Sequence, residues 1–264
     1  MDLQLKGKRA LVTGSTSGIG WAIARELAAE GAQVLLNGRE AGRLQQALQR
    51  LQAELPDATI DAVQADLSTA EGCQQLLTAA GGVDILVNNL GIFEPETFEQ
   101  ITDADWLRFF EVNVMSGVRL ARGQLAGMKL RGWGRIVFIS SESGICPPGD
   151  MVHYGMSKSA QLSVSRGLAE TCAGTGVTVN AVLPGPTRTE GVGDFFAKLA
   201  SDAGQTLAET ETNFFQHARP TSLLQRFIEP TEVAALVAYV CSPRSAATNG
   251  AALRVDGGVV RSLI

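Results

Sequence analysis

The sequence predicts an α/β fold in which a doubly wound parallel sheet of seven strands is covered by helices on both faces. Two observations favour this class. Short aliphatic runs alternate along the chain with longer segments whose apolar residues recur at helical spacing. The short runs are also almost continuously apolar, as strands are when both of their faces are buried. The length of 264 residues and the 45% share of hydrophobic residues suit one large domain over residues 1–264.

The predicted strands are rich in valine, isoleucine and leucine and end in polar or glycine residues. They are Arg9–Gly14, Ala32–Gly38, Thr59–Asp66, Val83–Asn89, Arg135–Ser141, Val177–Gly185 and Ala252–Gly258. The helices predicted between them are Ile19–Glu30, Glu40–Glu54, Ala70–Ala80, Asp103–Leu130, Met151–Cys172 and Thr231–Cys241. Thr231 is a candidate N-cap of the last helix. Elements that alternate in this way form a parallel sheet through right-handed crossovers.

One segment, Thr187–Glu229, interrupts the alternation. It is polar and contains glycine, yet it carries five phenylalanines. A long insertion in a compact fold usually has a function. We therefore expect a mobile substrate lid, whose phenylalanines close over an apolar substrate.

Composition narrows the range of partners. The net charge is −5 and the basic residues are scattered, which argues against nucleic acid and membrane surfaces as partners. The sequence has neither an apolar core of a signal peptide nor an apolar run long enough to span a bilayer, so we expect a cytoplasmic protein. Its cysteines are Cys73, Cys146, Cys172 and Cys241. Their wide spacing favours reduced, mostly packed thiols over disulfides, and neither they nor the two histidines have metal-ligand spacing.

A glycine-rich turn, TGSTSGIG at 13–20, joins the first predicted strand to the first helix. Gly14, Gly18 and Gly20 would allow a tight turn and close approach of a pyrophosphate, which would lie over the N-terminus of the helix. A tight turn without a ligand could have the same composition. Its position in the first strand-to-helix connection, where doubly wound sheets bind ligands, favours nucleotide binding in a Rossmann-like fold.

A second motif, HYGMSKSA at 153–160, places Tyr154 and Lys158 one helical turn apart on the same face of a helix. A phenol has a pKa of about 10, and a fixed ammonium nearby would stabilise the phenolate and lower that pKa. The same spacing occurs in ordinary amphipathic helices. The pair therefore indicates a catalytic function only in combination with the glycine turn that precedes it. His153 would point away from Tyr154, toward packing or the surface.

In their order along the chain, these motifs resemble those of the short-chain dehydrogenases/reductases of the single-domain type, including the ketoacyl carrier-protein reductases. Besides the two motifs above, the matches are NNLG at 88–91, Asn113, Ser141 and LPGPTRT at 183–189. Leu90 departs from the usual alanine and would place a bulkier side chain near the nicotinamide end of the site. Glu142 directly follows Ser141 and could contact the substrate, but we expect its carboxylate to face outward or to cap the backbone.

The resemblance implies an oxidoreductase that transfers a hydride between NADP(H) and a carbonyl or secondary alcohol of a small molecule. In that reaction Tyr154 would be the general acid or base, and Ser141 would hydrogen-bond the substrate oxygen. Lys158 would lower the pKa of Tyr154 and hold the ribose, and Asn113 would anchor a water. Ser141 has the family spacing to the tyrosine, whereas Ser140 would pack at the end of the sheet.

The resemblance also implies a cofactor site built from the glycine turn, the ends of the next strands, the catalytic helix and the start of the lid. Its residues would be Gly14, Thr16, Ser17, Gly18, Ile19, Gly20, Arg39, Asp66, Leu67, Asn89, Gly91, Tyr154, Lys158, Pro184, Gly185, Thr187 and Thr189. NAD-selective folds place an acidic residue at the end of the second strand. Here Gly38 leaves room and Arg39 can bind a 2′-phosphate, so NADP is favoured, with NAD possible.

Two alternatives remain open: a noncatalytic NADP-binding sensor or scaffold, and an NAD-dependent alcohol dehydrogenase. The substrate is open between a ketoacyl thioester, a small ketone, a sugar and a steroid-like alcohol, although the lid has no basic cluster for a carrier protein. Finally, the resemblance implies a homotetramer or homodimer formed through the helices at 103–130 and 151–172. The small residues Gly117, Ala121, Ala160 and Ser163 would let those helices approach.

Overall fold

A computed structural model describes residues 1–263, so position 264 of the predicted domain lies outside the description. All seven predicted strands form, and they pair in parallel in one sheet. The strands are β1 (Arg9–Val12), β2 (Gln33–Gly38), β3 (Ile60–Gln64), β4 (Ile85–Asn88), β5 (Gly134–Ile139), β6 (Val177–Pro184) and β7 (Ala252–Val255). Most end one to three residues before the predicted boundary. The polar and glycine residues there leave the ladder and begin the connecting loops.

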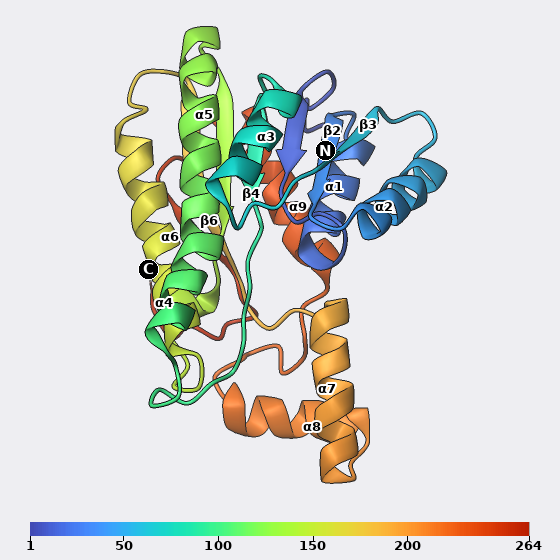
Figure 1. Ribbon diagram of the computed structural model, residues 1–264, viewed down its shortest axis with the longest axis vertical. Helices are drawn as coiled ribbons and strands as arrows, with labels where there is room; N and C mark the ends of the chain where they lie inside the picture. The colour runs from blue at the N-terminus through green and yellow to red at the C-terminus, as the bar shows by residue number, and fades with distance from the viewer. Residues whose placement is uncertain (264) are drawn as a thin grey trace.

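Helices cover both faces of this sheet (Figure 1). One face carries α1 (Gly18–Ala29), α2 (Ala41–Glu54) and α9 (Pro230–Cys241). The other carries α3 (Ala70–Ala80), α5 (Ser116–Arg131) and α6 (Val152–Glu170), and α4 (Asp103–Phe110) packs against α6. The prediction that Thr231 caps α9 is wrong. The N-cap is Glu229, which forms a capping box with Glu232, and Pro230 fits the first turn because it needs no N–H partner there.

The sheet has the strand order β3-β2-β1-β4-β5-β6-β7. The chain moves outward from β1 to β3 and then crosses back to β4, so its direction of winding reverses between β1 and β4. In their register Val12 lies beside Val87. The loops that follow these two strands therefore leave the same edge together, at the switch point where open α/β sheets bind ligands.

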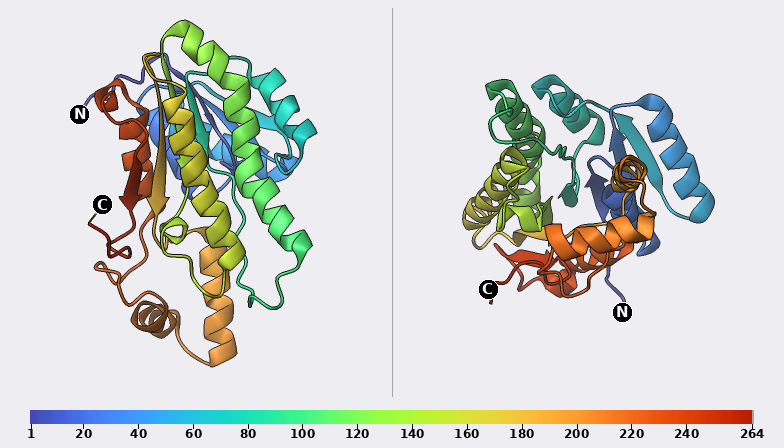
Figure 2. Two further views of the ribbon diagram at one scale, coloured as in Figure 1. Left: turned by 90° about the vertical axis from the view of Figure 1, so that its left-hand side faces the viewer. Right: turned by 90° about the horizontal axis from the view of Figure 1, so that it is seen from below.

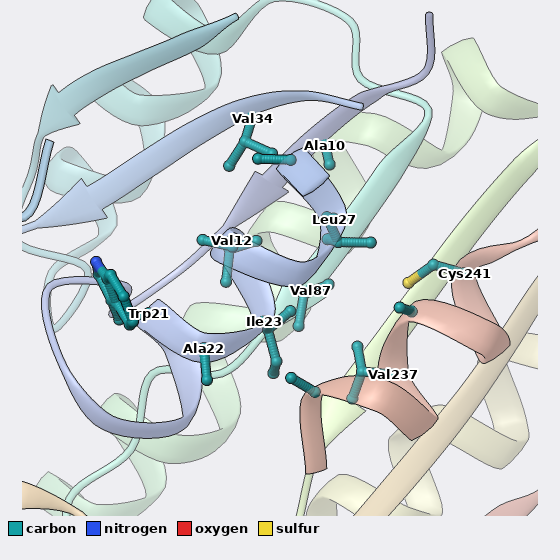
Figure 3. Close-up of a cluster of buried hydrophobic side chains, with 14 of the residues drawn as sticks. Ala10, Val12, Trp21, Ala22, Ile23, Leu27, Val34, Val87, Val237 and Cys241 are labelled. Carbon is teal, nitrogen blue, oxygen red and sulfur yellow. The ribbon is translucent and has the colours of Figure 1, made fainter. Parts of the chain in front are cut away.

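Buried apolar side chains form a core on each face of the sheet. On one face Ile23, Val87 and Val237 join β4 to α1 and α9, and all three are fully buried (Figure 3). On the other face α5 lies so close to β5 that a Cβ on Gly117 would stand 2.8 Å from the Phe138 ring. Close packing of this kind makes a core sensitive to small changes in volume.

This packing corrects part of the predicted assembly surface. Gly117 faces the sheet and so cannot act as a spacer between copies of the chain. Ala121 is buried but lines the groove between α5 and α6. Ala160 is half-buried and Ser163 is exposed, which leaves both available on the outside. The outer faces of α5 and α6 lie side by side (Figure 2) and border an apolar groove.

The predicted helix Asp103–Leu130 is continuous but is not α-helical throughout. Between α4 and α5 it contains a π-helical turn, η1 (Glu111–Met115). Such turns are often found at functional sites, because the extra residue changes the direction of the side chains on the helix. This turn carries Asn113.

The segment Thr187–Glu229 folds beyond the end of the sheet (Figure 1, Figure 2). It contains α7 (Glu190–Ala203), α8 (Leu207–Asn213) and η3 (Phe214–Ala218). The rings of Phe196 and Phe215 both pack on Phe227, with centroids 4.9 and 5.2 Å away. These three side chains are buried and form a small core for the segment itself, and Phe196 and Phe227 also line a pocket. The mobility of the segment stays a prediction.

Two other expectations from composition can be compared with the fold. Within residues 1–263, none of the helices combines the length and the apolar character needed to cross a membrane. The four cysteines are free thiols, and three of them are buried as expected. Cys146 differs because it lies in the exposed loop after η2 (Glu142–Gly144).

Candidate active site

Three of the four predicted catalytic side chains line one pocket. Ser141 lies two residues beyond the end of β5, and Tyr154 and Lys158 lie one turn apart on α6. The Lys158 Nζ atom donates a hydrogen bond to the carbonyl oxygen of Ile139 over 2.9 Å and lies 5.6 Å from the centroid of the Tyr154 ring. The end of β5 and the first turns of α6 therefore hold the serine, the phenol and the ammonium in one place, as the sequence predicts.

Asn113 supports this pocket from behind. It is 1% exposed, and its amide donates to the Ile92 carbonyl over 3.0 Å and to Ser157 Oγ over 2.9 Å. Its side-chain oxygen accepts from the Ile92 backbone N–H over 2.8 Å. The backbone carbonyl of Asn113 accepts from Gln161. Both N–H groups of the side chain are thus occupied, so Asn113 joins the loop after β4 to α6, and the predicted anchoring of a water would depend on its oxygen atoms.

Two neighbouring residues are structural, as expected. Ser140 Oγ donates to the backbone carbonyl of Lys158 over 2.9 Å and so ties β5 to α6. His153 is 2% exposed, and its ring lies 3.9 Å from that of Phe109 between centroids. Ser140 lines the pocket, but its hydroxyl proton is used in the contact with the Lys158 carbonyl.

The pKa values of the pair differ from the sequence prediction. Burial lowers the pKa of Lys158 to about 8, while the negative charge of Glu142 acts in the opposite direction. The pKa of Tyr154 is raised above its ordinary value, first by burial and then by Glu142. The net shift of the tyrosine pKa is therefore opposite to the predicted one, because desolvation penalises the phenolate more than its polar neighbours stabilise it. That Lys158 lowers this pKa stays a prediction.

The expectation for Glu142 is also wrong. Its carboxylate is 5% exposed, accepts a hydrogen bond from Ser141 Oγ, and forms an ion pair with Arg219 Nε at 3.3 Å. Ser141 Oγ also accepts from the Ser143 N–H over 3.1 Å, which begins the turn η2. This turn directs Glu142 inward, where it and Arg219 line the pocket. Sequence reasoning missed Arg219, because no local signal separates it from the other arginines of the segment.

At the other end of the site the glycine turn is packed closely. A Cβ on Gly20 would lie 2.3 Å from the Gly14 carbonyl oxygen and 2.4 Å from Asn89 Nδ2. Gly14 and Gly18 have φ values of 59° and 56°, which disfavour other residues. Ser17 makes no side-chain capping bond and the first turn of α1 has no acidic residue. The backbone N–H groups of the first turn of α1 can therefore receive an anion, so the glycine turn fits the pyrophosphate of a dinucleotide.

A second pocket adjoins the first along the carboxyl edge of the sheet. The two share Gly91 and Ile92, so they form one elongated cleft. Among the predicted cofactor residues, those lining the second pocket are Gly14, Thr16, Ser17, Arg39, Asp66, Leu67 and Gly91. Those lining the first are Ile19, Asn89, Gly91, Tyr154, Lys158, Pro184, Gly185, Thr187 and Thr189. Gly18 and Gly20 line neither and shape the turn instead.

Two residues of the second pocket change the sequence interpretation. Leu90 was expected near the nicotinamide end, but it lines the pocket of Arg39 and packs beneath Gly14. Arg43, in the first turn of α2, also lines this pocket and was missed. Its spacing of four residues from Arg39, at the start of a predicted helix, was the signal that could have revealed it.

Comparison with known proteins supplies independent findings. The family model for the short chain dehydrogenases matches residues 8–200. The chain is 52% identical to the uncharacterized oxidoreductase YvaG of Bacillus subtilis over 100% of both chains. It is 32% identical to the 3-oxoacyl-[acyl-carrier-protein] reductase FabG of Aquifex aeolicus over 98% of this chain and 100% of that protein. The structure of L-sorbose reductase from Gluconobacter frateurii, complexed with NADPH and L-sorbose, has a TM-score of 0.94 and 33% identity, covering 100% of both chains.

Proposed function

Because the chain belongs to the short-chain dehydrogenase family of oxidoreductases, we propose that it transfers a hydride between NADP(H) and a carbonyl or secondary alcohol of a small molecule. The observation that carries the proposal is a single cleft with Ser141, Tyr154 and Lys158 at one end and the glycine turn with Arg39 at the other. The nicotinamide would supply or accept the hydride. The chain itself would bind the cofactor and the substrate, orient them toward each other, and protonate the substrate oxygen.

Each catalytic side chain would act at the substrate oxygen or next to it. In reduction Tyr154 would donate its proton to that oxygen, and the raised pKa of the phenol keeps it protonated at neutral pH. Ser141 would hydrogen-bond the same oxygen as negative charge develops. Lys158, whose pKa is about 8, would hold the ribose hydroxyls of the cofactor and keep positive charge beside the phenol.

NADP is the preferred cofactor in this proposal. Arg39 and Arg43 line the pocket at the end of β2, where a 2′-phosphate would lie. The Arg39 side chain is 72% exposed and its pair with Glu40 is 3.5 Å long, so this surface contact would yield readily to a phosphate. The NADPH complex of the similar L-sorbose reductase gives further support.

The remaining organisation is proposed on the same basis. We propose that residues 1–264 form one NAD(P)-binding domain with 187–229 as the substrate lid, assembled as a homotetramer or homodimer. The apolar groove between α5 and α6, lined by Val118, Leu125, Val164 and Leu168 among others, supports that assembly. A cytoplasmic location stays a prediction.

The direct test measures NADPH and NADH consumption by the purified chain with a panel of ketones, hydroxy ketones and ketoacyl thioesters. We expect turnover with NADPH. We also expect NADPH to bind the chain, which a fluorescence titration measures. Tight NADPH binding without turnover on any carbonyl or alcohol would favour the noncatalytic sensor instead. A preference for NADH would favour the NAD-dependent alcohol dehydrogenase.

A further inference from the structure

The buried carboxylate of Glu142 has no role in the reaction proposed above. Its side chain is 6% exposed, and that of its partner Arg219 is 16% exposed. Removing such a pair from water is costly and often stabilises a fold no better than apolar side chains would. A charged pair on a pocket wall therefore calls for an explanation in terms of what the pocket binds.

The position of Glu142 relative to the reacting atoms limits the explanation. Ser141 would contact the substrate oxygen, and Ser141 Oγ donates to the Glu142 carboxylate. The carboxylate thus lies one hydrogen bond beyond the atom that holds the carbonyl. Its two contacts, Ser141 and Arg219, leave about two of its roughly four acceptor positions unused. A donor on the carbon next to the carbonyl could reach one of them.

The charges around the pocket select the kind of donor. The charged side chains that line it, within residues 1–263, are Glu142, Lys158 and Arg219. A substrate carboxylate beside Glu142 would be repelled, and an ammonium would meet Arg219 and Lys158. A neutral hydroxyl can donate to the carboxylate and accept from the guanidinium, so it suits both partners. The other walls include Phe93, Met151 and Phe195, which suit a small carbon chain.

We propose that Glu142 and Arg219 form a hydroxyl subsite that selects neutral ketones with a hydroxyl on the carbon adjacent to the carbonyl and, in the reverse direction, vicinal diols. The inference rests on the proposed function, because it takes the substrate oxygen to lie at Ser141. It names the substrate class that the catalytic residues alone leave open.

The subsite also affects the serine. A hydroxyl has a single proton, and that of Ser141 is directed to Glu142. When a substrate hydroxyl donates to an unused acceptor position of Glu142, the serine is no longer the only hydroxyl that satisfies this carboxylate, and its proton can turn to the carbonyl oxygen. The adjacent hydroxyl should therefore raise kcat as well as lower KM.

A matched pair of ketones tests the subsite, since hydroxyacetone and butanone differ by a hydroxyl in place of a methyl. We expect the wild type with NADPH to favour hydroxyacetone in kcat/KM. In Glu142→Gln the ratio of the two values should fall at least about tenfold, the scale of a buried hydrogen bond to a charged group. Because the ratio is compared between variants, the different intrinsic reactivity of the ketones cancels. The matched control is Glu211→Gln, which removes a lid carboxylate that pairs with Arg188 at 2.9 Å outside the pocket and should leave the ratio unchanged.

Binding provides a readout that needs no turnover. In the NADPH complex, where alcohols cannot be oxidised, ligand-observed NMR should detect tighter binding of propylene glycol than of sec-butanol, with the difference lost in Glu142→Gln. Equal binding of the two alcohols to the wild type, or an equal loss of activity on both ketones in the variant, would overturn the subsite and leave Glu142 as a positioning residue for Ser141. The expected binding difference without turnover of any ketone would retain the subsite and overturn the proposed reaction.

Discussion

The Lys158 ammonium is fixed by the Ile139 carbonyl, to which it donates a hydrogen bond over 2.9 Å at the end of β5. Because α6 carries both Lys158 and Tyr154, a bond that fixes the ammonium also fixes its position relative to the tyrosine ring. A Cβ on Gly91 would lie only 3.3 Å from Nζ, so the loop after β4 closes the other side. The end of the cleft that holds Tyr154 and Lys158 is thus assembled by backbone groups of the sheet edge as much as by side chains.

Tyr154→Phe should remove the transferable proton while keeping the ring. We expect turnover with NADPH to fall at least about a hundredfold, the scale for loss of a general acid, with little change in NADPH affinity. Steady-state kinetics and fluorescence titration measure the two quantities. Near-normal turnover would contradict the role of the phenol.

Lys158→Ala should impair both turnover and NADPH binding. It removes the charge beside the phenol and the group proposed to hold the ribose, so kcat should fall and the Kd for NADPH should rise. Circular dichroism is the control, because loss of the bond to Ile139 could also loosen α6. A folded variant with unchanged NADPH affinity would exclude contact between Lys158 and the cofactor.

The pH dependence of reduction should report Lys158. Burial lowers its pKa to about 8 in the folded protein, so the protonated fraction and with it kcat/KM should decline above that pH. Glu142 raises the pKa of Lys158 by its negative charge. In Glu142→Gln the decline should therefore begin at lower pH.

Butanone is the substrate for this comparison, because it lacks the hydroxyl that Glu142 would bind. The control is again Glu211→Gln, whose profile should match that of the wild type. If the decline of kcat/KM at high pH is the same in Glu142→Gln, or moves to higher pH, then Lys158 does not control that decline.

Cofactor choice should depend on the two arginines of the second pocket. A charge-assisted contact to a phosphate contributes about 1.5–3 kcal/mol, so Arg39→Leu or Arg43→Leu should lower kcat/KM for NADPH roughly ten- to hundredfold with little effect for NADH. An acidic residue at Gly38 is a poorer test. Its Cβ would lie 2.5 Å from Thr16 Cγ2, so the turn itself would be disturbed. Wild-type enzyme that prefers NADH would refute the assignment.

The sheet and the placement of Tyr154 beside Lys158 were predictable, and the reasons are physical. Strands such as β6 are buried on both faces and read as continuous apolar runs. Tyr154 and Lys158 share one helix, so their spacing alone predicts that they face one way. Gly14 and Gly18 have positive φ values, which a glycine motif encodes directly.

The subsite was not predictable because it depends on contacts between distant segments. Glu142 and Arg219 are separated by 77 positions, and nothing near either residue indicates the other. A carboxylate after a strand is usually solvated, and only the turn η2 directs this one inward. The pKa of Tyr154 was misjudged for the same reason, since spacing indicates the neighbouring charge but not the depth of burial.

Assembly should use the outer faces of α5 and α6. Leu125 lines the apolar groove between them, and Leu125→Asp would place a charge in a buried interface, so we expect smaller species in sedimentation velocity. Ala53→Asp provides the control, because that exposed position lies on α2 at the other end of the sheet. A wild type that is monomeric at micromolar concentration would rule out the proposed oligomer.

Closure of the segment Thr187–Glu229 should depend on Arg219, since its ion pair with Glu142 joins the lid to the end of β5. We expect amide hydrogen exchange in α7 and α8 to be faster than in β5, and to slow when NADPH and propylene glycol are both bound. Arg219→Gln removes the charge and should reduce that slowing, whereas Arg226→Gln, which alters a lid arginine paired with Glu232 outside the pocket, should not. Peptides from α2 serve as an internal reference. Slow exchange in α7 and α8 that ligands leave unchanged would instead make the segment a rigid part of the domain, held by the Phe196, Phe215 and Phe227 core.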